Sequence, residues 1–308
     1  MQHARTPQSD YLLGLGRTIL EPYTRLATAR AAMITGSSAE GVSDHYSDLD
    51  MTVYYEGALP DEAALAAIRE GHGATQRAWL LGDRADGSFA EAYELGGVQA
   101  QIGHATIAAW ENDIAEVLDR WNADTPLHKA MSGTLECVAV YGEDLIDRWK
   151  ARIRAYPDGL ARAMVDTRLQ IFPVWYVQDA LDARDATLWH FQIRVETAYA
   201  LLGVLAGVNR LYFTTFQFKK MHRFVAEMRV KPERFAERLD DLFQQPSAAA
   251  AATLEALTRK CSRWLGARCR KSTSRRCSGG SEAGAHAGST HRMVRCNSLA
   301  YIRFTVQR

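Results

Sequence analysis

Hydrophobic and polar residues follow two periods along the first half of the chain. Residues 10–30 have apolar positions at helical spacing, with Asp10 as the expected N-cap and Pro22 as the expected kink or break. Residues 31–35 and 49–55 are short apolar runs that favour β-strands. The polar segment between these runs has to turn the chain back, so the pattern predicts strand, turn, short helix and strand.

A hairpin and two further helices are predicted after this unit. A helix over 61–71 begins at an acidic cap and ends at a glycine. Residues 75–81 and 89–95 have strand character, and Gly96-Gly97 joins the latter to an alternating run as a hairpin. Residues 107–121 have the spacing of another helix.

The second half of the chain has a different pattern. From Glu143 to about Lys260 almost every segment has helical period, and beyond it the sequence is rich in Arg, Ser, Gly, Ala and Cys with little periodicity. The predicted fold class is therefore α/β (α+β) followed by all-helical. We expect an α/β domain over 1–142, a helical bundle over 143–265 and a low-order basic tail over 266–308.

Composition is that of a globular protein, with an uneven distribution of charge. The 308 residues are 47% hydrophobic and 24% charged, and no apolar run is long enough to cross a bilayer. We therefore expect a cytoplasmic protein without a membrane partner. Residues 261–308 hold 10 basic residues against one acid, whereas 1–260 hold 27 against 35. Such a tail could contact nucleic acid electrostatically, but its abrupt change of composition fits a disordered extension or translation in a shifted frame better.

Two aspartates lie at the start of the strand predicted over 49–55. Because side chains alternate along a strand, Asp48 and Asp50 point to one face while Leu49 and Met51 point to the other. Two neighbouring carboxylates repel and raise each other's pKa unless a cation lies between them. Mg²⁺ prefers such oxygen ligands and leaves positions open for substrate phosphates. The pattern predicts a Mg²⁺ site, with a solvated strand face or a calcium-decorated loop as the alternatives.

Gly36-Ser37, at the end of the preceding strand, supplies groups that bind phosphate. A glycine lets the backbone N–H groups approach a polyphosphate closely, and a serine hydroxyl adds a donor. A Gly-Ser pair alone is ordinary turn chemistry. At this spacing from the two aspartates, and between two apolar strands, it predicts a nucleotide site.

These residues carry a resemblance to a known superfamily. The stretch looks like the signature of DNA polymerase β-like nucleotidyltransferases, and the matching positions are Gly36-Ser37, Gly41, Asp44 and Ser47-Asp48-Leu49-Asp50. The resemblance implies a mixed sheet flanked by helices over about 30–105, with a helical partner domain. The helical part is similar in layout to the lincosamide and aminoglycoside nucleotidyltransferases.

The resemblance implies roles for individual residues. Gly36, Ser37 and Ser47 would hold the triphosphate, and Asp48 and Asp50 would bind the metal ions. The implied reaction moves a nucleoside monophosphate, AMP from Mg-ATP, onto a hydroxyl of a small-molecule acceptor, with an antibiotic as one candidate.

Two lysines of the second domain are a further candidate. Lys219 and Lys220 could clamp phosphates there, and a solvated pair of lysines is the alternative.

The sequence departs from the superfamily at the expected third carboxylate. The strand after Gly96-Gly97 presents Gln101 where an acid is usual, and an amide oxygen can ligate a cation but cannot take a proton. Glu94, or Glu91 on the same strand, could reach across the hairpin, and His104 is another candidate base. The alternatives to a transferase of small molecules are a catalytically degenerate nucleotide-binding or regulatory protein, and an antitoxin-like enzyme that nucleotidylates a protein.

Aromatic residues at helical spacing are most often core, which is what we expect for five residues of the second domain: Trp175, Tyr176, Trp189, Phe191 and Tyr199.

Overall fold

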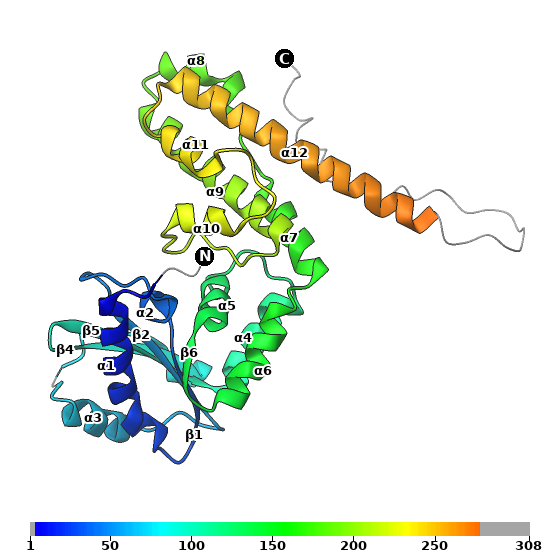
Figure 1. Ribbon diagram of the computed structural model, residues 1–308. Helices are drawn as coiled ribbons and strands as arrows, with labels where there is room; N and C mark the ends of the chain where they lie inside the picture. Colours follow the sequence, from blue (N-terminus) through cyan, green and yellow to red (C-terminus); the bar gives the residue numbers. More distant parts are fainter. Residues whose placement is uncertain (1–3, 75, 278–308) are drawn as a thin grey trace, which may run out of the picture. The chain divides into compact units, whose positions relative to one another are not determined.

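The chain divides into two compact units. The computed structural model describes residues 4–74 and 76–277 (Figure 1), and the units are Met1–Leu160 and Ala161–Arg308. The division falls inside helix α7 (Asp158–Arg168), later than the boundary expected after residue 142. Helix α6 (Glu143–Arg154), which was expected to open the helical domain, therefore belongs to the first unit.

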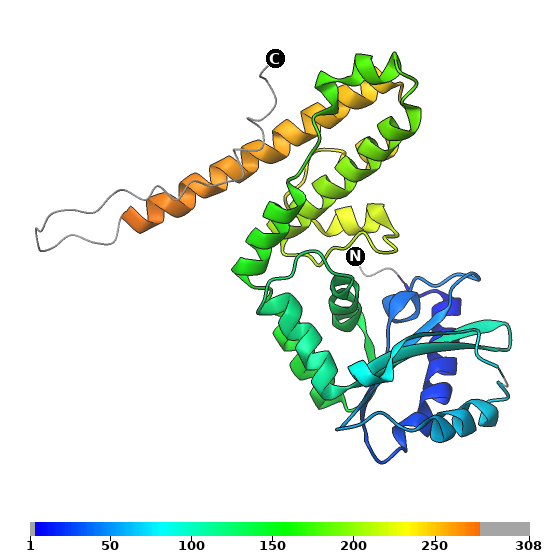
Figure 2. The same ribbon diagram turned by 180° about the vertical axis from the view of Figure 1, so that it is seen from behind.

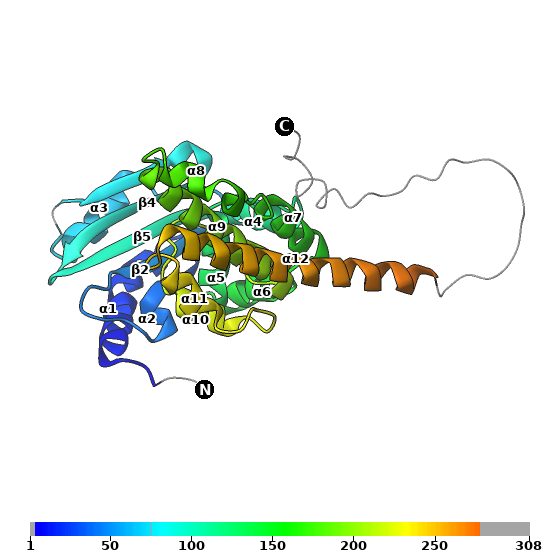
Figure 3. The same ribbon diagram turned by 90° about the horizontal axis from the view of Figure 1, so that it is seen from above.

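A six-stranded mixed sheet forms the centre of the first unit, which agrees with the mixed sheet that the resemblance implied. The strand order is β3-β4-β5-β2-β1-β6, in which β2 and β5 run parallel and all other neighbours run antiparallel. Seen from above, β2, β4 and β5 lie side by side (Figure 3). Gly96 and Gly97 turn the β4–β5 hairpin, both with positive φ. The strands are β1 (Ala29–Ile34), β2 (Leu49–Tyr55), β3 (Trp79–Asp83), β4 (Ser88–Leu95), β5 (Val98–Thr106) and β6 (Val138–Tyr141).

Helices α1 (Pro7–Thr24) and α3 (Glu62–Gly71) cover one face of this sheet (Figure 1). Alternation along β2 turns Leu49, Met51 and Val53 toward this layer, where they are almost fully buried in the main hydrophobic core.

The start of α1 differs from the expectation. Its N-cap is Thr6, whose hydroxyl accepts the N–H of Ser9, rather than Asp10. Pro22 lies inside the helix and does not end it. The proline has no N–H to donate to the carbonyl four residues before it, and α1 ends two residues later at Thr24.

The opposite face of the sheet packs against α4 (Ile107–Leu118) and α6 (Figure 2). The Tyr54 ring of β2 lies 5.8 Å from that of Trp110 in α4 and 4.7 Å from that of Trp149 in α6. Helix α5 (Leu127–Glu136), which the sequence pattern did not predict, packs beside both helices. Short helix α2 (Gly36–Glu40) connects β1 to β2, as predicted.

The second unit is helical over its described residues, as the sequence predicted. Helix α12 continues to Cys277, so residues 266–277 are helical where a low-order tail was expected, and 278–308 lie outside the described residues. After α7 come the 3₁₀ turn Val174–Tyr176 and helices α8 (Gln178–Asp182), α9 (Thr187–Asn209), α10 (Met221–Glu227), α11 (Phe235–Asp241) and α12 (Ser247–Cys277).

Helix α9 contains both buried and exposed apolar residues. Within the described part of the chain it is the one helix long and apolar enough to span a membrane by length and composition, and 67% of that window is buried inside the protein. Three of the aromatic residues expected in the core are exposed instead, namely Tyr176, Trp189 and Phe191.

Candidate functional site

The two halves of the sequence motif meet at Gly36 and Asp50. Gly36 opens α2 directly after β1 with φ +66°, a conformation that favours glycine. A Cβ built on it would lie 2.2 Å from Oδ2 of Asp50. The Thr35 N–H also donates to the Asp50 carbonyl at 2.9 Å. Glycine is therefore required at this position both by its backbone conformation and by the carboxylate against it.

Gln101 lies beside the aspartates, where the sequence placed it. In the parallel β2–β5 register Asp50 pairs with Gln101, so their side chains share a face of the sheet. Nε2 of Gln101 donates to Oδ2 of Asp48 at 2.5 Å and to Oε1 of Gln99 at 3.1 Å. The position expected to hold a third carboxylate thus supplies an amide that donates to the first one.

Ser47 is used in shaping the loop before Asp48. Its hydroxyl donates to Oδ1 of Asp44 and accepts the N–H of Asp44, both at 3.0 Å, and the Tyr46 N–H reaches the same carboxylate oxygen. These bonds lower the pKa of Asp44, with the Ser47 hydroxyl as the largest cause. The structure thus gives Ser47 a turn-forming role, and its predicted contact with a nucleotide stays a prediction.

Ser37 is partly exposed on α2, next to Gly36. Its Oγ lies 3.0 Å from Oγ of Ser43, a buried residue of the α2–β2 loop. The hydroxyl is therefore held by a neighbour of its own chain while it remains partly accessible to solvent.

Glu94 shares the face of Gln99 and Gln101. It pairs with Gln99 across the β4–β5 hairpin and is exposed. Because neighbouring strands lie about 4.8 Å apart, the backbone of Glu94 is about 10 Å from β2. Glu94 thus lies on the same face of the sheet as Asp50 and Gln101, but two strands away from the aspartates.

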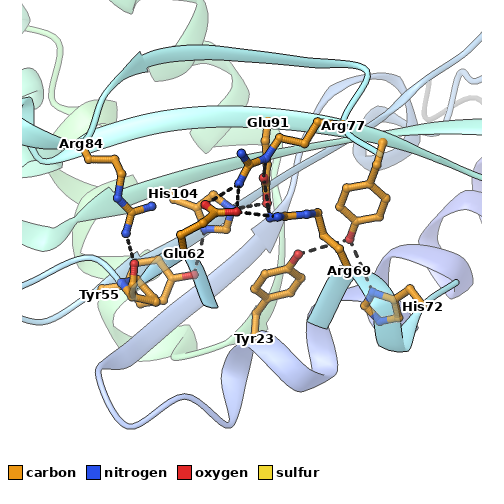
Figure 4. Close-up of polar contacts among 11 residues, drawn as sticks. Tyr23, Tyr55, Glu62, Arg69, His72, Arg77, Arg84, Glu91 and His104 are labelled. Carbon is orange, nitrogen blue, oxygen red and sulfur yellow. Dashed lines mark hydrogen bonds and ion pairs between the residues drawn. The ribbon is translucent and has the colours of Figure 1, made fainter. Parts of the chain in front are cut away.

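His104 lies on the other face of the sheet, which corrects the expectation that it serves as a base beside Asp48 and Asp50. It pairs with Phe89 in the β4–β5 register, three residues beyond Gln101 in β5. Its side chain is fully buried in the layer under α1 and α3. Nδ1 lies 2.9 Å from the Tyr55 hydroxyl, and Nε2 lies 3.4 Å from a carboxylate oxygen of Glu91 (Figure 4).

Glu91 is the centre of a buried ionic network on that same face (Figure 4). Its carboxylate, which is 0% exposed, accepts from Nη1 of Arg69 at 2.8 Å and from Nε of Arg77 at 2.6 Å. Burial by itself raises the pKa of Glu91, but His104 and the two guanidinium groups outweigh burial and lower the pKa to about 2. Burial lowers the pKa of His104, so the imidazole is neutral at pH 7. Glu91 is therefore a structural anion and not a candidate base.

The two lysines predicted to clamp phosphates belong to the second unit. Lys219 and Lys220 are exposed and directly precede α10, and Lys220 has φ +59°. Their predicted role stays a prediction.

The donor set fits Mg²⁺ in part. Within residues 4–74 and 76–277 no group of three or more His, Cys, Asp or Glu side chains could hold a metal. Asp48 and Asp50 provide two carboxylates on one face, which suits a cation that takes one or two protein carboxylates and completes its shell with water and phosphates. The site could hold Mg²⁺ that arrives with a triphosphate better than Mg²⁺ alone.

An open cleft lies elsewhere in the first unit. It has a volume of about 560 Å³ and is lined by Gly57 after β2, by Thr106 at the end of β5, and by Arg84 and Gly87 of the turn between β3 and β4. None of the predicted site residues lines it. The cleft and the motif therefore lie at different places in the first unit.

Comparisons with known proteins add little to this geometry. No protein family model matches the chain. No curated protein matches it either. Among solved structures it is similar to a nucleotidyltransferase-like protein from Exiguobacterium sibiricum 255-15, with a TM-score of 0.37 and 10% sequence identity, over 79% of this chain and 73% of that one.

Proposed function

We propose that this chain is a cytoplasmic nucleotidyltransferase that moves AMP from Mg-ATP onto a hydroxyl of a small molecule. The observation that carries the proposal is the contact of Gly36 with Asp50, which joins the phosphate-binding half of the motif to its carboxylate half. Gly36 lies against the Asp50 carboxylate near the start of β2, and this contact is not part of an apolar core. It does suit a triphosphate whose cation is held by the same carboxylate.

Each side chain has a distinct part in the proposed reaction. Asp48 and Asp50 would hold Mg²⁺, which, when bound, neutralises the charge of the triphosphate. Ser37 would donate its hydroxyl proton to a phosphate oxygen, and the Gly36 backbone leaves room for it. An oxygen of the acceptor forms a bond to the α-phosphorus, the bond from that phosphorus to the bridging oxygen breaks, and pyrophosphate leaves.

The proton of the acceptor hydroxyl requires a base. Glu94 is exposed on the same face as Gln101, whereas His104 and Glu91 lie on the opposite face. We assign the proton to Glu94, or to solvent when the acceptor is sufficiently acidic.

A second candidate function is nucleotide binding without transfer. The hydrogen bond from Gln101 to Asp48 favours it, because an amide in this position adds no negative charge for a second cation. This candidate keeps the same nucleotide site and differs only in turnover.

The test is pyrophosphate release from each nucleoside triphosphate with Mg²⁺, over a panel of hydroxylated small molecules and one of proteins. We expect release with ATP and a small-molecule acceptor, and its loss in Asp50→Asn. Binding of Mg-ATP without release by any acceptor supports the second candidate. Failure of wild type to bind any triphosphate would contradict both candidates.

A further inference from the structure

The N-terminal segment is hydrogen-bonded to helix α2, which carries the proposed phosphate-binding residue Ser37, and to the loop after it. Thr6 is the N-cap of α1, and Ser9 lies in its first turn and is fully buried. Both contact Ser43, a buried residue 34 or more positions further along the chain, in the loop between α2 and β2. The contact is therefore a long-range one made by side chains.

The hydrogen bonds around Ser43 form a closed ring. The Ser43 N–H donates to Oγ of Ser9 at 2.8 Å, and the Thr6 hydroxyl donates to the Ser43 carbonyl at 2.8 Å. The hydroxyls of Thr6 and Ser9 are also 2.8 Å apart. Since the Thr6 proton is used on the Ser43 carbonyl, the Ser9 hydroxyl is the donor in that pair. Both backbone polar groups of Ser43 are thus satisfied by side chains of α1.

Arg5 adds a second attachment. Its guanidinium donates to the carbonyl of Ser38 at 2.5 Å and to that of Ala39 at 3.1 Å, which are groups at the C-terminal end of α2. Its Nε donates to Asp10 of α1 at 3.1 Å. Gly41, with φ +80°, ends α2 against Arg5, and a Cβ there would lie 3.1 Å from Cγ of the arginine. The segment from Arg5 to Ser9 therefore holds both helix α2, which contains Ser37, and the loop that follows this helix.

We infer that Ser43 is a positioning residue that orients the Ser37 hydroxyl toward a bound phosphate, and that Thr6 and Ser9 hold it in place. Two protons are available in the pair of hydroxyls 3.0 Å apart, and the bond between them uses one. Ser43 is buried and Ser37 is partly exposed. When Ser43 donates to Ser37, the Ser37 proton is free to donate outward, which is the direction a phosphate would need. The inference rests on the proposed nucleotide site.

The experiment is a double-mutant cycle on the Kd of Mg-ATP, measured by calorimetry on the full chain. Ser37→Ala is expected to raise Kd about tenfold, as for a hydrogen bond to a charged group. Ser43→Ala is expected to raise it about threefold to fivefold in wild type and not at all in the Ser37→Ala background. A purely structural role would instead raise Kd by the same factor in both backgrounds.

Conservative variants separate positioning from folding. Thr6→Ser keeps the hydroxyl and should leave Kd unchanged, whereas Thr6→Val keeps the shape, loses the ring and should raise Kd as Ser43→Ala does. Melting temperatures of all variants are measured alongside, so a loss of folding is recognised directly.

Two results would overturn the inference and leave the proposed function standing. One is wild-type Kd in Ser43→Ala, and the other is an equal effect of Thr6→Ser and Thr6→Val. If wild type itself does not bind Mg-ATP, the proposed function fails and the inference fails with it.

Discussion

The two faces of the sheet hold carboxylates in opposite circumstances. Under α1 and α3, Glu91 is fully buried, and guanidinium groups of Arg69 and Arg77 reach it at 2.8 and 2.6 Å. On the other face Asp48 is half-buried and accepts a hydrogen bond from the neutral amide of Gln101, with Asp50 on the same face. One carboxylate has its charge compensated by arginines, whereas the charge of Asp48 is met by an amide.

This difference shows which carboxylates the fold itself accounts for. A buried charge is tolerated only when it is paired and hydrogen-bonded, so the Glu91 network is what folding requires of a carboxylate in that position. On the other face Asp48 accepts the hydrogen bond of Gln101 and lies near Asp50, and this pair of carboxylates is the one that the proposed Mg²⁺ site would use. The lowered pKa values of Glu91 and His104 belong to the structural face, so a search for the site by shifted pKa values would lead to the wrong face.

The largest expected effect is on the structural face. Glu91→Gln leaves Arg69 without its buried carboxylate partner, and we expect it to lower the free energy of unfolding by about 3–5 kcal/mol. Urea denaturation measures this. The matched control is Glu62→Gln, which removes a half-exposed carboxylate that contacts the same two arginines and should cost less than about 1 kcal/mol. Equal costs for the two variants would show that burial of Glu91 does not set the difference between the faces.

Acid should weaken the same network. The pKa of Glu91 is about 2 in the folded protein against an ordinary value of 4.5, so the unfolded chain binds the proton first as pH falls. Stability from this group is complete above pH 4.5 and is lost as pH falls toward 2, by about 3 kcal/mol in all. His104, whose pKa is lowered by burial, adds a loss in the same direction below its ordinary value of 6.5.

Urea denaturation at a series of pH values checks this expectation. The free energy of unfolding should fall between pH 5 and pH 3, and Glu91→Gln should flatten that fall. A free energy of unfolding that stays constant over this range would contradict the assignment of Glu91 as a paired anion.

The third prediction moves to the face of the proposed site. Asp48→Asn keeps the shape and can still accept the hydrogen bond from Gln101, so its free energy of unfolding should change by less than about 1 kcal/mol. The Kd of Mg-ATP should rise about 30-fold, or about 2 kcal/mol, because the ligand loses a charged partner. Calorimetry and urea denaturation of the same preparation give both numbers. A variant that lost stability but kept its affinity would reverse the roles of the two faces.

Sequence periodicity predicted much of the first unit because its strands are short, apolar and bounded by turn residues. The alternation of Leu49, Asp50 and Met51 placed the aspartates on one face, and Gly96-Gly97 gave the hairpin that brings Gln101 to the register of Asp50. Helix α5 was missed, since its apolar positions are few and the segment before it carries no clear cap.

The parts that could not be predicted depend on contacts between distant segments. His104 was a candidate base only for its ordinary pKa near 6.5; alternation along β5 already separates its face from that of Gln101, three positions away, whereas its buried contact with Glu91 leaves no signal in the sequence. The ring of Thr6, Ser9 and Ser43 leaves no local pattern in the sequence. The N-cap of α1 is Thr6 where Asp10 was expected, and nothing near Thr6 in the sequence indicated that the cap also binds a loop.

The smallest expected effect tests the amide that replaces a carboxylate. In Gln101→Glu the new carboxylate oxygen takes the place of an amide nitrogen 2.5 Å from Oδ2 of Asp48, so without a cation the two oxygens repel. We expect the variant to melt lower than wild type in EDTA and to regain that difference as Mg²⁺ is added, with Mg²⁺ bound about tenfold more tightly, or about 1.4 kcal/mol. Gln99→Glu is the control, because Gln99 lies on the same face and touches Gln101 but makes no hydrogen bond to Asp48 among those found in the described residues.

If wild type turns over slowly, the added carboxylate should also raise turnover, because it can accept a proton. If wild type is already fast, turnover should fall while Mg²⁺ affinity still rises. Unchanged Mg²⁺ dependence in Gln101→Glu would mean that β5 does not face a cation, and the distinction between the two faces would lose its functional half.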